Sequence, residues 1–415
     1  MAVENRLPTE GLSTSDLVAW PGELRLLLDE EAGELLAAVA GAAGGTLASW
    51  RPRQVDHQPG RFTVVQYRTT ITWPHGETTS ETFVAATGER IPSNGAAIFD
   101  DGETRVAVWR WIKDPFLPGL LDAVDPGKVA SLLDDLGIDG GTVQLRTRAY
   151  RPARRAVIEA TGRRGRLFLK VVRPRRVRDL HEIHRLLAAE LPVPKSLGWT
   201  DQGTIVLSAR PGQTLRKALR SSREPPPPPE AIIDLLDRLP AELGKRTRRR
   251  DLLSSAEHHA GVIAATVPTM RDRLNPLLDA LRSAIDPEGG DVTAVHGDLY
   301  EAQLLVDRGR ITGLLDVDTA GAGLRIDDLA DFCAHLSVLA VMSDRPKHIK
   351  RYGTDLLAYA ERDHPPRLLR PRIAASMLGL ATGPFRVLET DWELNTLRRL
   401  ELAHEWLEDL VPPQR

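Results

Sequence analysis

The sequence predicts an α+β protein with β-rich segments in its first half and helices in its second half. Between residues 61 and 112, and again between 148 and 209, β-branched and aromatic residues gather in short runs that are separated by turns. After five consecutive prolines at 225–229, the apolar residues follow the helical period almost throughout. The chain has 415 residues, which is too long for one ordinary core, so we expect two or three packed units.

Composition excludes several classes of protein. The 55 basic and 57 acidic residues give a formal net charge of -2, so no overall field attracts nucleic acid. The basic run GKRTRRRD (244–251) lacks aromatic residues and is typical of a solvated helix face, so we expect no nucleic-acid partner. Cys333 is the only cysteine, which excludes an intrachain disulfide and a cysteine metal cluster and fits a reducing compartment.

The first residues, MAVENRLPTEGLSTSDL, lack the basic-then-apolar order of a signal peptide. No run of about 18 apolar residues occurs that could span a membrane. We therefore expect a cytoplasmic protein without a membrane partner, while the sequence leaves the oligomeric state open.

Residues 1–139 are expected to form an α+β unit that precedes the rest of the fold like a cap. The pattern LRLLLDEEAGELLAAVAGAA at 24–43 predicts one amphipathic helix, which Gly44 and Gly45 end. Three strands are expected at 61–73, 80–87 and 105–112, and a further helix at 129–136. The unit is therefore predicted to be a helix on an antiparallel sheet.

Residues 140–212 predict a second β-rich unit, and residues 213–415 a larger helical one. In the second unit, 148–174 gives two or three strands, a helix follows at 177–191, and TIVLSA at 204–209 gives a further strand. Both β-rich units carry an Arg-Pro pair before a strand, a turn and a strand. This theme leaves two explanations open: an old duplication, or the ordinary resemblance between antiparallel hairpins.

Lys170 and Glu182 are the first candidates for chemistry. Phosphoryl transfer needs a cation on the nucleotide phosphates, and Lys170 in RLFLKVV would hold an ammonium group at the face of a sheet. Glu182 lies on the next helix, where it could pair with Lys170; Glu190 is the second candidate for that role. The alternatives are a solvated edge lysine and a surface glutamate.

His296, Gly297 and Asp298 open the most informative segment, HGDLYEAQLL. Gln303 follows five residues after Asp298, and two short strands around a turn would bring it close to Asp316. Amide and carboxylate oxygens are suitable ligands for magnesium, and Asp298 in the preceding loop could accept a proton from a substrate hydroxyl. The alternative for Asp298 alone is a capping residue.

Three neighbours have weaker assignments. We expect His296 to order the loop rather than act as a base. Asp318, two residues after Asp316, could touch metal or substrate or could cap the next turn. Asp328 is expected to be structural.

The segment HGDLYEAQLLVDRGRITGLLDVDTAGAGLRIDDLADF resembles the core of the aminoglycoside phosphotransferase family, the small-molecule branch of the protein-kinase-like fold. The resemblance runs from about Tyr150 to the end of the chain. It implies a bilobal fold with a small β-rich N-lobe at 140–212 and a mostly helical C-lobe at 213–415, both preceded by the cap-like unit.

The resemblance also implies a nucleotide site. Lys170 would bind the phosphates of ATP, and Glu182 would orient Lys170. TIVLSARPGQTL resembles the segment that links the lobes, so the backbone of Ser208, Ala209 and Arg210 would pair with adenine.

In the same way, the resemblance makes Asp298 the catalytic base and makes Gln303 and Asp316 the ligands of Mg2+. It implies a phosphotransferase that uses ATP and magnesium and acts on a hydroxyl of a small molecule.

Several positions depart from the family pattern. Gln303 replaces the usual asparagine, and Val317 replaces an aromatic residue. The phosphate-covering loop is not glycine-rich, since Arg154 and Arg155 occupy its place. Glutamine at this position also occurs in maltokinase- and glucosamine-kinase-type sugar kinases, which carry an N-terminal cap, so Gln303 favours that branch.

We therefore expect a kinase for a sugar, an amino sugar or an aminoglycoside-like compound. An antibiotic-resistance enzyme shares this core chemistry, and an acidic pocket would favour it; Glu389, Asp391 and Glu393 beside Trp392 could attract a cationic substrate or simply face water. A catalytically inactive nucleotide-binding regulator is the non-enzyme alternative. A protein kinase is less well supported, because no APE-like segment follows Asp316.

Overall fold

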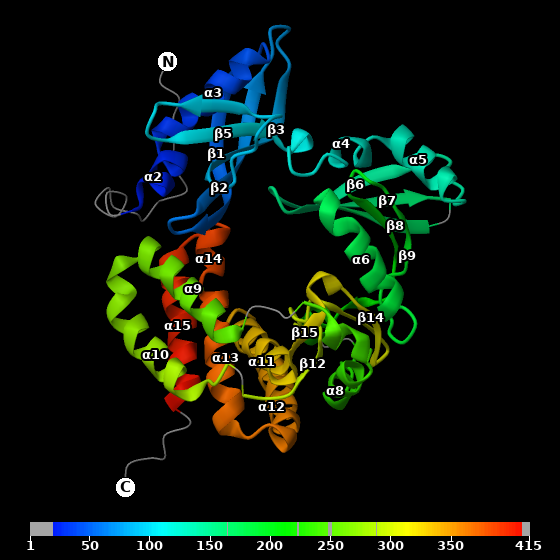
Figure 1. Ribbon diagram of the computed structural model, residues 1–415, viewed down its shortest axis with the longest axis vertical. Helices are drawn as coiled ribbons and strands as arrows, with labels where there is room; N and C mark the ends of the chain where they lie inside the picture. The colour runs from blue at the N-terminus through cyan, green and yellow to red at the C-terminus, as the bar shows by residue number, and fades with distance from the viewer. Residues whose placement is uncertain (1–19, 164, 222–223, 248–250, 288, 409–415) are drawn as a thin grey trace.

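The computed structural model describes residues 20–163, 165–221, 224–247, 251–287 and 289–408. Two β-sheets with their helices occupy the upper part of Figure 1, and a mostly helical part lies below them. This is the α+β, bilobal, capped architecture that the sequence predicted. Part of the basic run, 248–250, lies outside the described residues.

The cap sheet is antiparallel, with strand order β1-β2-β3-β5-β4. Its strands are β1 Thr46–Gln58, β2 Phe62–Thr72, β3 Thr78–Gly88, β4 Ala97–Asp100 and β5 Arg105–Arg110. The single helix expected at 24–43 is two helices, α2 Gly22–Leu28 and α3 Glu30–Ala42. The break falls at Asp29, whose extended backbone ends α2 and whose carboxylate accepts the Glu30 N–H at 2.8 Å as the N-cap of α3.

The second sheet repeats the strand order of the cap, β6-β7-β8-β10-β9. Its strands are β6 Gln144–Arg151, β7 Arg155–Gly162, β8 Gly165–Val172, β9 Ser196–Trp199 and β10 Thr204–Ser208. Helix α6 (Pro174–Leu187) follows β8, whereas a loop without a helix follows β3. The shared order agrees with the duplication hypothesis for the strands but not for α6. In the chain, α4 (Leu120–Ala123) and α5 (Pro126–Asp135) connect the two sheets, and their buried side chains pack against the second one.

The remaining part is mainly helical. Its helices are α7 Leu215–Ser221, α8 Glu230–Asp237, α9 Leu252–Thr266, α10 Arg271–Ala284, α11 Arg325–Val341, α12 Pro346–Asp363, α13 Pro366–Ala381, α14 Gly383–Arg386 and α15 Trp392–Glu408. Two small sheets, β11-β13-β14 and β12-β15, lie at its boundary with the second sheet. Their strands are β11 Gln213–Thr214, β12 Val292–Val295, β13 Leu304–Asp307, β14 Arg310–Leu314 and β15 Gly321–Leu324.

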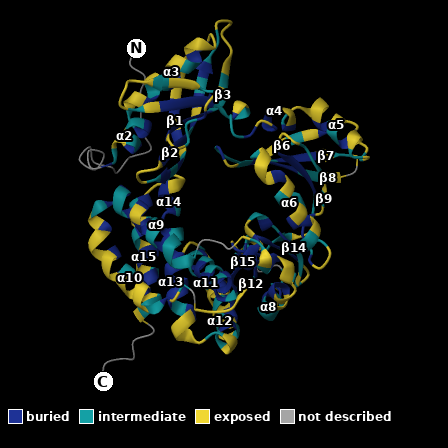
Figure 2. Ribbon diagram, viewed as in Figure 1, coloured by how far each residue is buried: buried dark blue, intermediate teal, exposed yellow. Residues whose placement is uncertain are grey.

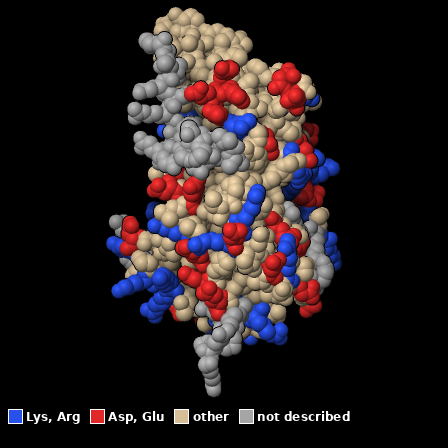
Figure 3. All heavy atoms as spheres, turned by 90° about the vertical axis from the view of Figure 1, so that its left-hand side faces the viewer, with Lys and Arg blue, Asp and Glu red and all other residues tan. Residues whose placement is uncertain are grey.

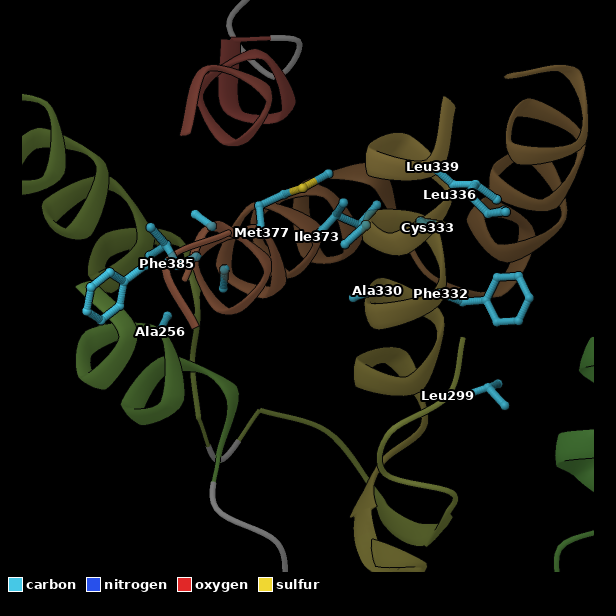
Figure 4. Close-up of a cluster of buried hydrophobic side chains, with 14 of the residues drawn as sticks. Ala256, Leu299, Ala330, Phe332, Cys333, Leu336, Leu339, Ile373, Met377 and Phe385 are labelled. Carbon is cyan, nitrogen blue, oxygen red and sulfur yellow. The ribbon is translucent and has the colours of Figure 1, made fainter. Parts of the chain in front are cut away.

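Helix α11 is the centre of the helical core. Buried side chains leave it on two sides: Phe332 lies on the same side as Leu299, while Ile373 and Met377 of α13 lie on the other (Figure 4). Leu299 directly follows Asp298, so burial of its apolar side chain anchors the loop that the sequence singled out. Buried positions of this kind continue through α11 and α13 in Figure 2.

The cap contacts the helical part through aromatic residues. The indole of Trp20 lies edge-on to Phe385, with ring centroids 5.9 Å apart, and its Nε1 donates to the Thr266 carbonyl at 2.9 Å. Trp392 completes the cluster at 6.4 Å from Trp20 and is buried. Trp392 is therefore a packing residue at the cap interface.

Acidic and basic side chains alternate over the face shown in Figure 3, with no broad area of one sign. Within the described ranges, no helix combines the length and apolarity that crossing a membrane requires.

Candidate active site

A buried carboxylate holds the loop that carries Asp298. Asp328, near the start of α11, accepts the backbone N–H groups of His296 and Gly297 at 2.7 Å each. The His296 ring adds two contacts: Nε2 donates to the Leu315 carbonyl at 2.9 Å, and Nδ1 accepts the Asp298 N–H at 3.3 Å. His296 and Asp328 thus order the loop, while the Asp298 side chain remains exposed.

Gln303 and Asp316 are adjacent, as their spacing predicted. The Leu315 N–H donates to the Gln303 carbonyl at 2.8 Å, and the Gln303 Nε2 lies 3.4 Å from the Asp316 Oδ2. Asp316 has a left-handed backbone (φ 56°, ψ 45°), which is uncommon for a residue other than glycine. This conformation turns its carboxylate out of the strand direction at the end of β14.

Lys170 and Arg155 bind the carboxylates that follow β14. The Lys170 Nζ lies 2.8 Å from Asp316 and 2.5 Å from Asp318. Arg155 makes a bidentate pair with Asp316 at 2.7 and 2.8 Å. Burial alone would raise the pKa of Asp316, but the two cations outweigh it and hold that pKa below its ordinary value.

A cavity of about 520 Å³ opens beside this cluster. Asp298 and Asp316 line it from the loop side, and α9, α11 and α13 form its opposite walls. Tyr300 stacks on His335 within it, with ring centroids 4.2 Å apart. Burial, together with Arg216 and two further arginines, lowers the pKa of His335 to about 3, so this ring is neutral at physiological pH.

Arginines outnumber acidic residues in the lining of this cavity, which we call the acceptor cavity. The arginines are Arg151, Arg155, Arg216, Arg220, Arg386 and Arg399, and the acidic residues are Asp298, Glu301, Asp316, Asp327 and Asp331. The acidic residues Glu389, Asp391 and Glu393, which could have attracted a cationic substrate, do not line it. The cavity is therefore not acidic.

Comparison with known proteins identifies the family. Residues 151–364, just over half of the chain, match the model of the phosphotransferase enzyme family. The chain belongs to this family. It is accordingly a small-molecule kinase, an enzyme that transfers a phosphoryl group to a hydroxyl. A search of curated proteins finds no match.

Solved structures similar to this phosphotransferase are distant in sequence. A thermostable mutant of aminoglycoside phosphotransferase APH(4)-Ia in its apo form is 16% identical, with a TM-score of 0.49, and the match covers 68% of this chain and 98% of that chain. A putative aminoglycoside phosphotransferase from Ralstonia eutropha JMP134 is 13% identical, with a TM-score of 0.46 and coverage of 69% and 98%. Plasmodium vivax ethanolamine kinase is 12% identical, with a TM-score of 0.42 and coverage of 63% and 82%.

The expected pair between Glu182 and Lys170 is not formed in the phosphotransferase. Glu182 is exposed on α6, and the second candidate, Glu190, is exposed beyond the end of that helix. The helical period explains this, because α6 buries Leu180, Ile183 and His184 on one face and turns Glu182 to solvent. Lys170 is held instead by the carboxylates after β14.

His184, also on α6, is close enough to Lys170 for the ammonium group to affect its pKa. Its Nδ1–H donates to the Pro194 carbonyl at 2.8 Å, and its Nε2 is buried without a partner among the described residues. Burial lowers the pKa of His184, and Lys170 lowers it further, so the ring is neutral. The sequence pointed to the acidic residue of HEIH, although the helical period favoured its second histidine.

The segment between the lobes is only partly available for pairing with a base. The Ser208 N–H donates to the Lys195 carbonyl at 2.9 Å, and the Ser208 Oγ accepts the Lys195 N–H at 2.9 Å. Arg210 directs its Nε to the Thr312 carbonyl at 3.1 Å. The N–H of Ser208 is thus engaged, while the pairing of adenine with the backbone of Ser208, Ala209 and Arg210 stays a prediction.

Sequence reasoning missed the role of the turn between β6 and β7. Asp114, from the segment between the cap and α4, accepts the Ala153 N–H and the Tyr150 hydroxyl at 2.8 Å each. This buried carboxylate fixes the turn that carries Arg151, and Arg155 begins the next strand. Nothing in the sequence links Asp114 to a turn that lies almost 40 residues later.

Proposed function

We propose that this phosphotransferase moves the γ-phosphate of ATP to a hydroxyl of a sugar-like molecule in a magnesium-dependent reaction. One observation carries the proposal: Asp298 and Asp316 line the same cavity, and Lys170 and Arg155 bind Asp316 at its edge. A hydroxyl in the acceptor cavity would therefore lie beside a carboxylate, with cations for the phosphates close by.

Each of these residues has a distinct task in the proposed reaction. Asp298 orients the acceptor hydroxyl and accepts its proton, since its side chain is exposed to the cavity. Lys170 and Arg155 bind phosphate oxygens, and Arg155 stands where a glycine-rich loop would otherwise cover the phosphates. Catalysis by such a site rests on positioning and charge stabilisation rather than on covalent chemistry.

The donor atoms around Asp316 suit a magnesium ion. Asp316 and Asp318 supply carboxylates and Gln303 an amide oxygen, while magnesium takes one or two carboxylates and completes its shell with water and phosphate oxygens. Gln303 presents its NH2 group to Asp316, so it would hold the ion with its amide turned the other way, oxygen toward the carboxylate. Bound magnesium would neutralise charge on the transferred phosphoryl group.

The charge of the acceptor cavity favours a neutral or acidic acceptor over a cationic one. Arginines outnumber acidic residues in its lining, so a polycation such as an aminoglycoside would meet repulsion there. The antibiotic-resistance alternative depended on an acidic pocket and is therefore the weaker one. Stacked Tyr300 and His335 give the cavity an aromatic wall of the kind that sugars pack against.

A turnover screen tests the proposal. Magnesium with ATP or GTP is supplied with sugars, amino sugars, sugar acids, sugar phosphates and aminoglycosides, and wild type is compared with Asp298→Asn and with Asp344→Asn, which removes an exposed carboxylate of the C-lobe. We expect turnover with a sugar-class acceptor, loss of it in Asp298→Asn, and no change in Asp344→Asn. Nucleotide binding without turnover of any acceptor would favour the inactive regulator, and an active Asp298→Asn would overturn the assigned base.

A further inference from the structure

A small cavity lies where the cap, the turn between β6 and β7, and the helical part meet. Its volume is about 120 Å³, and we call it the junction cavity. The cap contributes Asp56 and His57, the turn contributes Arg151 and Arg154, and α14 contributes Arg386. Since a water molecule takes about 30 Å³ in the liquid, the space suits a group as large as a phosphate or a carboxylate.

The positive charge around Arg151 is not balanced by carboxylates, since three arginines and only one acidic residue, Asp56, affect the pKa of this residue. The side chain of Arg151 is half-buried and forms no ion pair with any described residue, although arginines shielded from water normally pair with a carboxylate. Burial and the neighbouring Arg386, Arg154 and Arg155 lower the pKa of Arg151 to about 10, and only Asp56 opposes this shift. Asp56 is itself engaged, because it pairs with Arg154 at 2.8 Å.

A second observation also indicates a missing ligand. His57 is 5% exposed, and its Nδ1 lies 2.9 Å from the Thr63 Oγ1. Its Nε2 has no hydrogen-bond partner among the described residues, and the side chain lines the junction cavity. A buried ring nitrogen without a partner costs free energy, and a small turn of the His57 ring toward the junction cavity would let an oxygen-bearing ligand recover it.

The junction cavity and the acceptor cavity share two arginines. Arg151 and Arg386 line both, and the acceptor cavity also contains Asp298. A molecule with its reacting hydroxyl at Asp298 can therefore extend toward Arg151. In the proposed function the phosphates of the nucleotide are assigned to Lys170 and Arg155, which bind Asp316. Arg151 also lines a third cavity, beside Asp298 and Asp318, so the assignment of Arg151 to the acceptor is tested against the nucleotide below.

Building on the proposed function, we propose that Arg151, Arg386 and His57 bind an anionic group of the acceptor, either a phosphate or a carboxylate. The acceptor is then an acidic polyhydroxy compound of the sugar phosphate or sugar acid class. The cap takes part in substrate recognition, because it supplies His57 and holds Arg154 through Asp56.

Inorganic phosphate tests the subsite without turnover. Its binding to the full chain is measured by calorimetry, first without nucleotide and then with saturating magnesium and AMP-PNP. We expect wild type to bind phosphate in both conditions and Arg151→Gln, Arg386→Gln and His57→Gln each to weaken binding about tenfold, the loss of one charge-assisted contact. Arg185→Gln, which removes an exposed arginine of α6, should bind like wild type.

Three outcomes overturn the subsite: no binding by wild type, equal binding by Arg151→Gln, and competition by AMP-PNP, which would assign these arginines to the nucleotide. Arg151→Lys keeps the charge and should restore part of the binding, which separates loss of the site from loss of the fold.

Acceptor pairs test the substrate class. Each neutral sugar is compared with its uronic acid and its monophosphate, and we expect an acidic member to have a kcat/KM at least about tenfold higher. In Arg151→Gln its KM should rise about tenfold while the KM of magnesium-ATP stays within about twofold. A neutral sugar that remains the better substrate in every set refutes the acidic acceptor. If no compound is phosphorylated while phosphate binding depends on Arg151, the proposed function fails but the anion subsite stands.

Discussion

Replacing Asp328 tests whether one buried carboxylate sets the geometry of the catalytic loop. Asp328 is 1% exposed and accepts two backbone N–H groups, those of His296 and Gly297, at 2.7 Å. A hydrogen bond to a charged group contributes about 1.5–3 kcal/mol, so Asp328→Ala should lower the free energy of unfolding by roughly 3–6 kcal/mol. Asp328→Asn keeps one acceptor oxygen but places an NH2 group against the second N–H, so it should lose about half as much.

Urea denaturation, followed by circular dichroism, measures these losses, and steady-state kinetics on the same samples measures kcat. The kcat of Asp328→Asn should fall with its stability, because Asp298 directly follows the anchored residues. Asp344→Asn serves as the control, since its carboxylate is exposed. A loss below about 1 kcal/mol in Asp328→Ala, or equal losses in the two Asp328 variants, would refute the idea that the paired hydrogen bonds hold the loop.

Three further predictions concern the site. In Asp298→Asn, kcat should fall by about 10²–10⁴ while the KM of ATP changes little, as steady-state kinetics would show. Lys170→Met should raise the KM of magnesium-ATP at least about tenfold and lower the free energy of unfolding by roughly 3 kcal/mol, because Asp316 loses a buried partner; unchanged values would contradict its role. The pKa of His335 is about 3 in the folded chain, so the unfolded chain takes up its proton first and stability is lost as pH falls below about 6.5. Between pH 7 and pH 5 this loss is about 2 kcal/mol, and His335→Phe should abolish it in urea titrations; an equal pH dependence in both proteins would contradict the assignment.

Local patterns predicted most of the fold. Alternating apolar residues gave β2, β3, β5, β8 and β10, and the helical period gave α5 and α6 to within a few residues. The strands that the sequence did not reveal were β1, β4, β9, β11, β12 and β15, which are short or rich in polar residues. Their pairing depends on neighbouring strands rather than on their own composition.

The pairing of residues that lie far apart in the chain was predictable only where one short turn controls it. Gln303 and Asp316 lie 13 residues apart on a hairpin, so their approach followed from the sequence. Glu182 failed as the partner of Lys170, since a shift of one or two positions on a helix moves a side chain from the sheet to solvent. The sequence showed a glutamate at about the right distance but not which face of α6 would be buried.

Arg155 shows why the remaining part of the site could not be predicted from the sequence without the three-dimensional structure. The sequence indicated only that arginines replace a glycine-rich loop, which could have meant a weakened phosphate site. In the structure, Arg155 and Lys170 both bind Asp316, so the carboxylate expected to hold magnesium is already neutralised by two cations. In the proposed reaction Asp316 would hold the ion, and the guanidinium of Arg155 and the ammonium of Lys170, which now bind Asp316, would bind phosphate oxygens. In a glycine-rich loop, a row of backbone N–H groups binds the phosphate oxygens. We infer that Arg155 takes over this task here, because a guanidinium group can bind two phosphate oxygens at once.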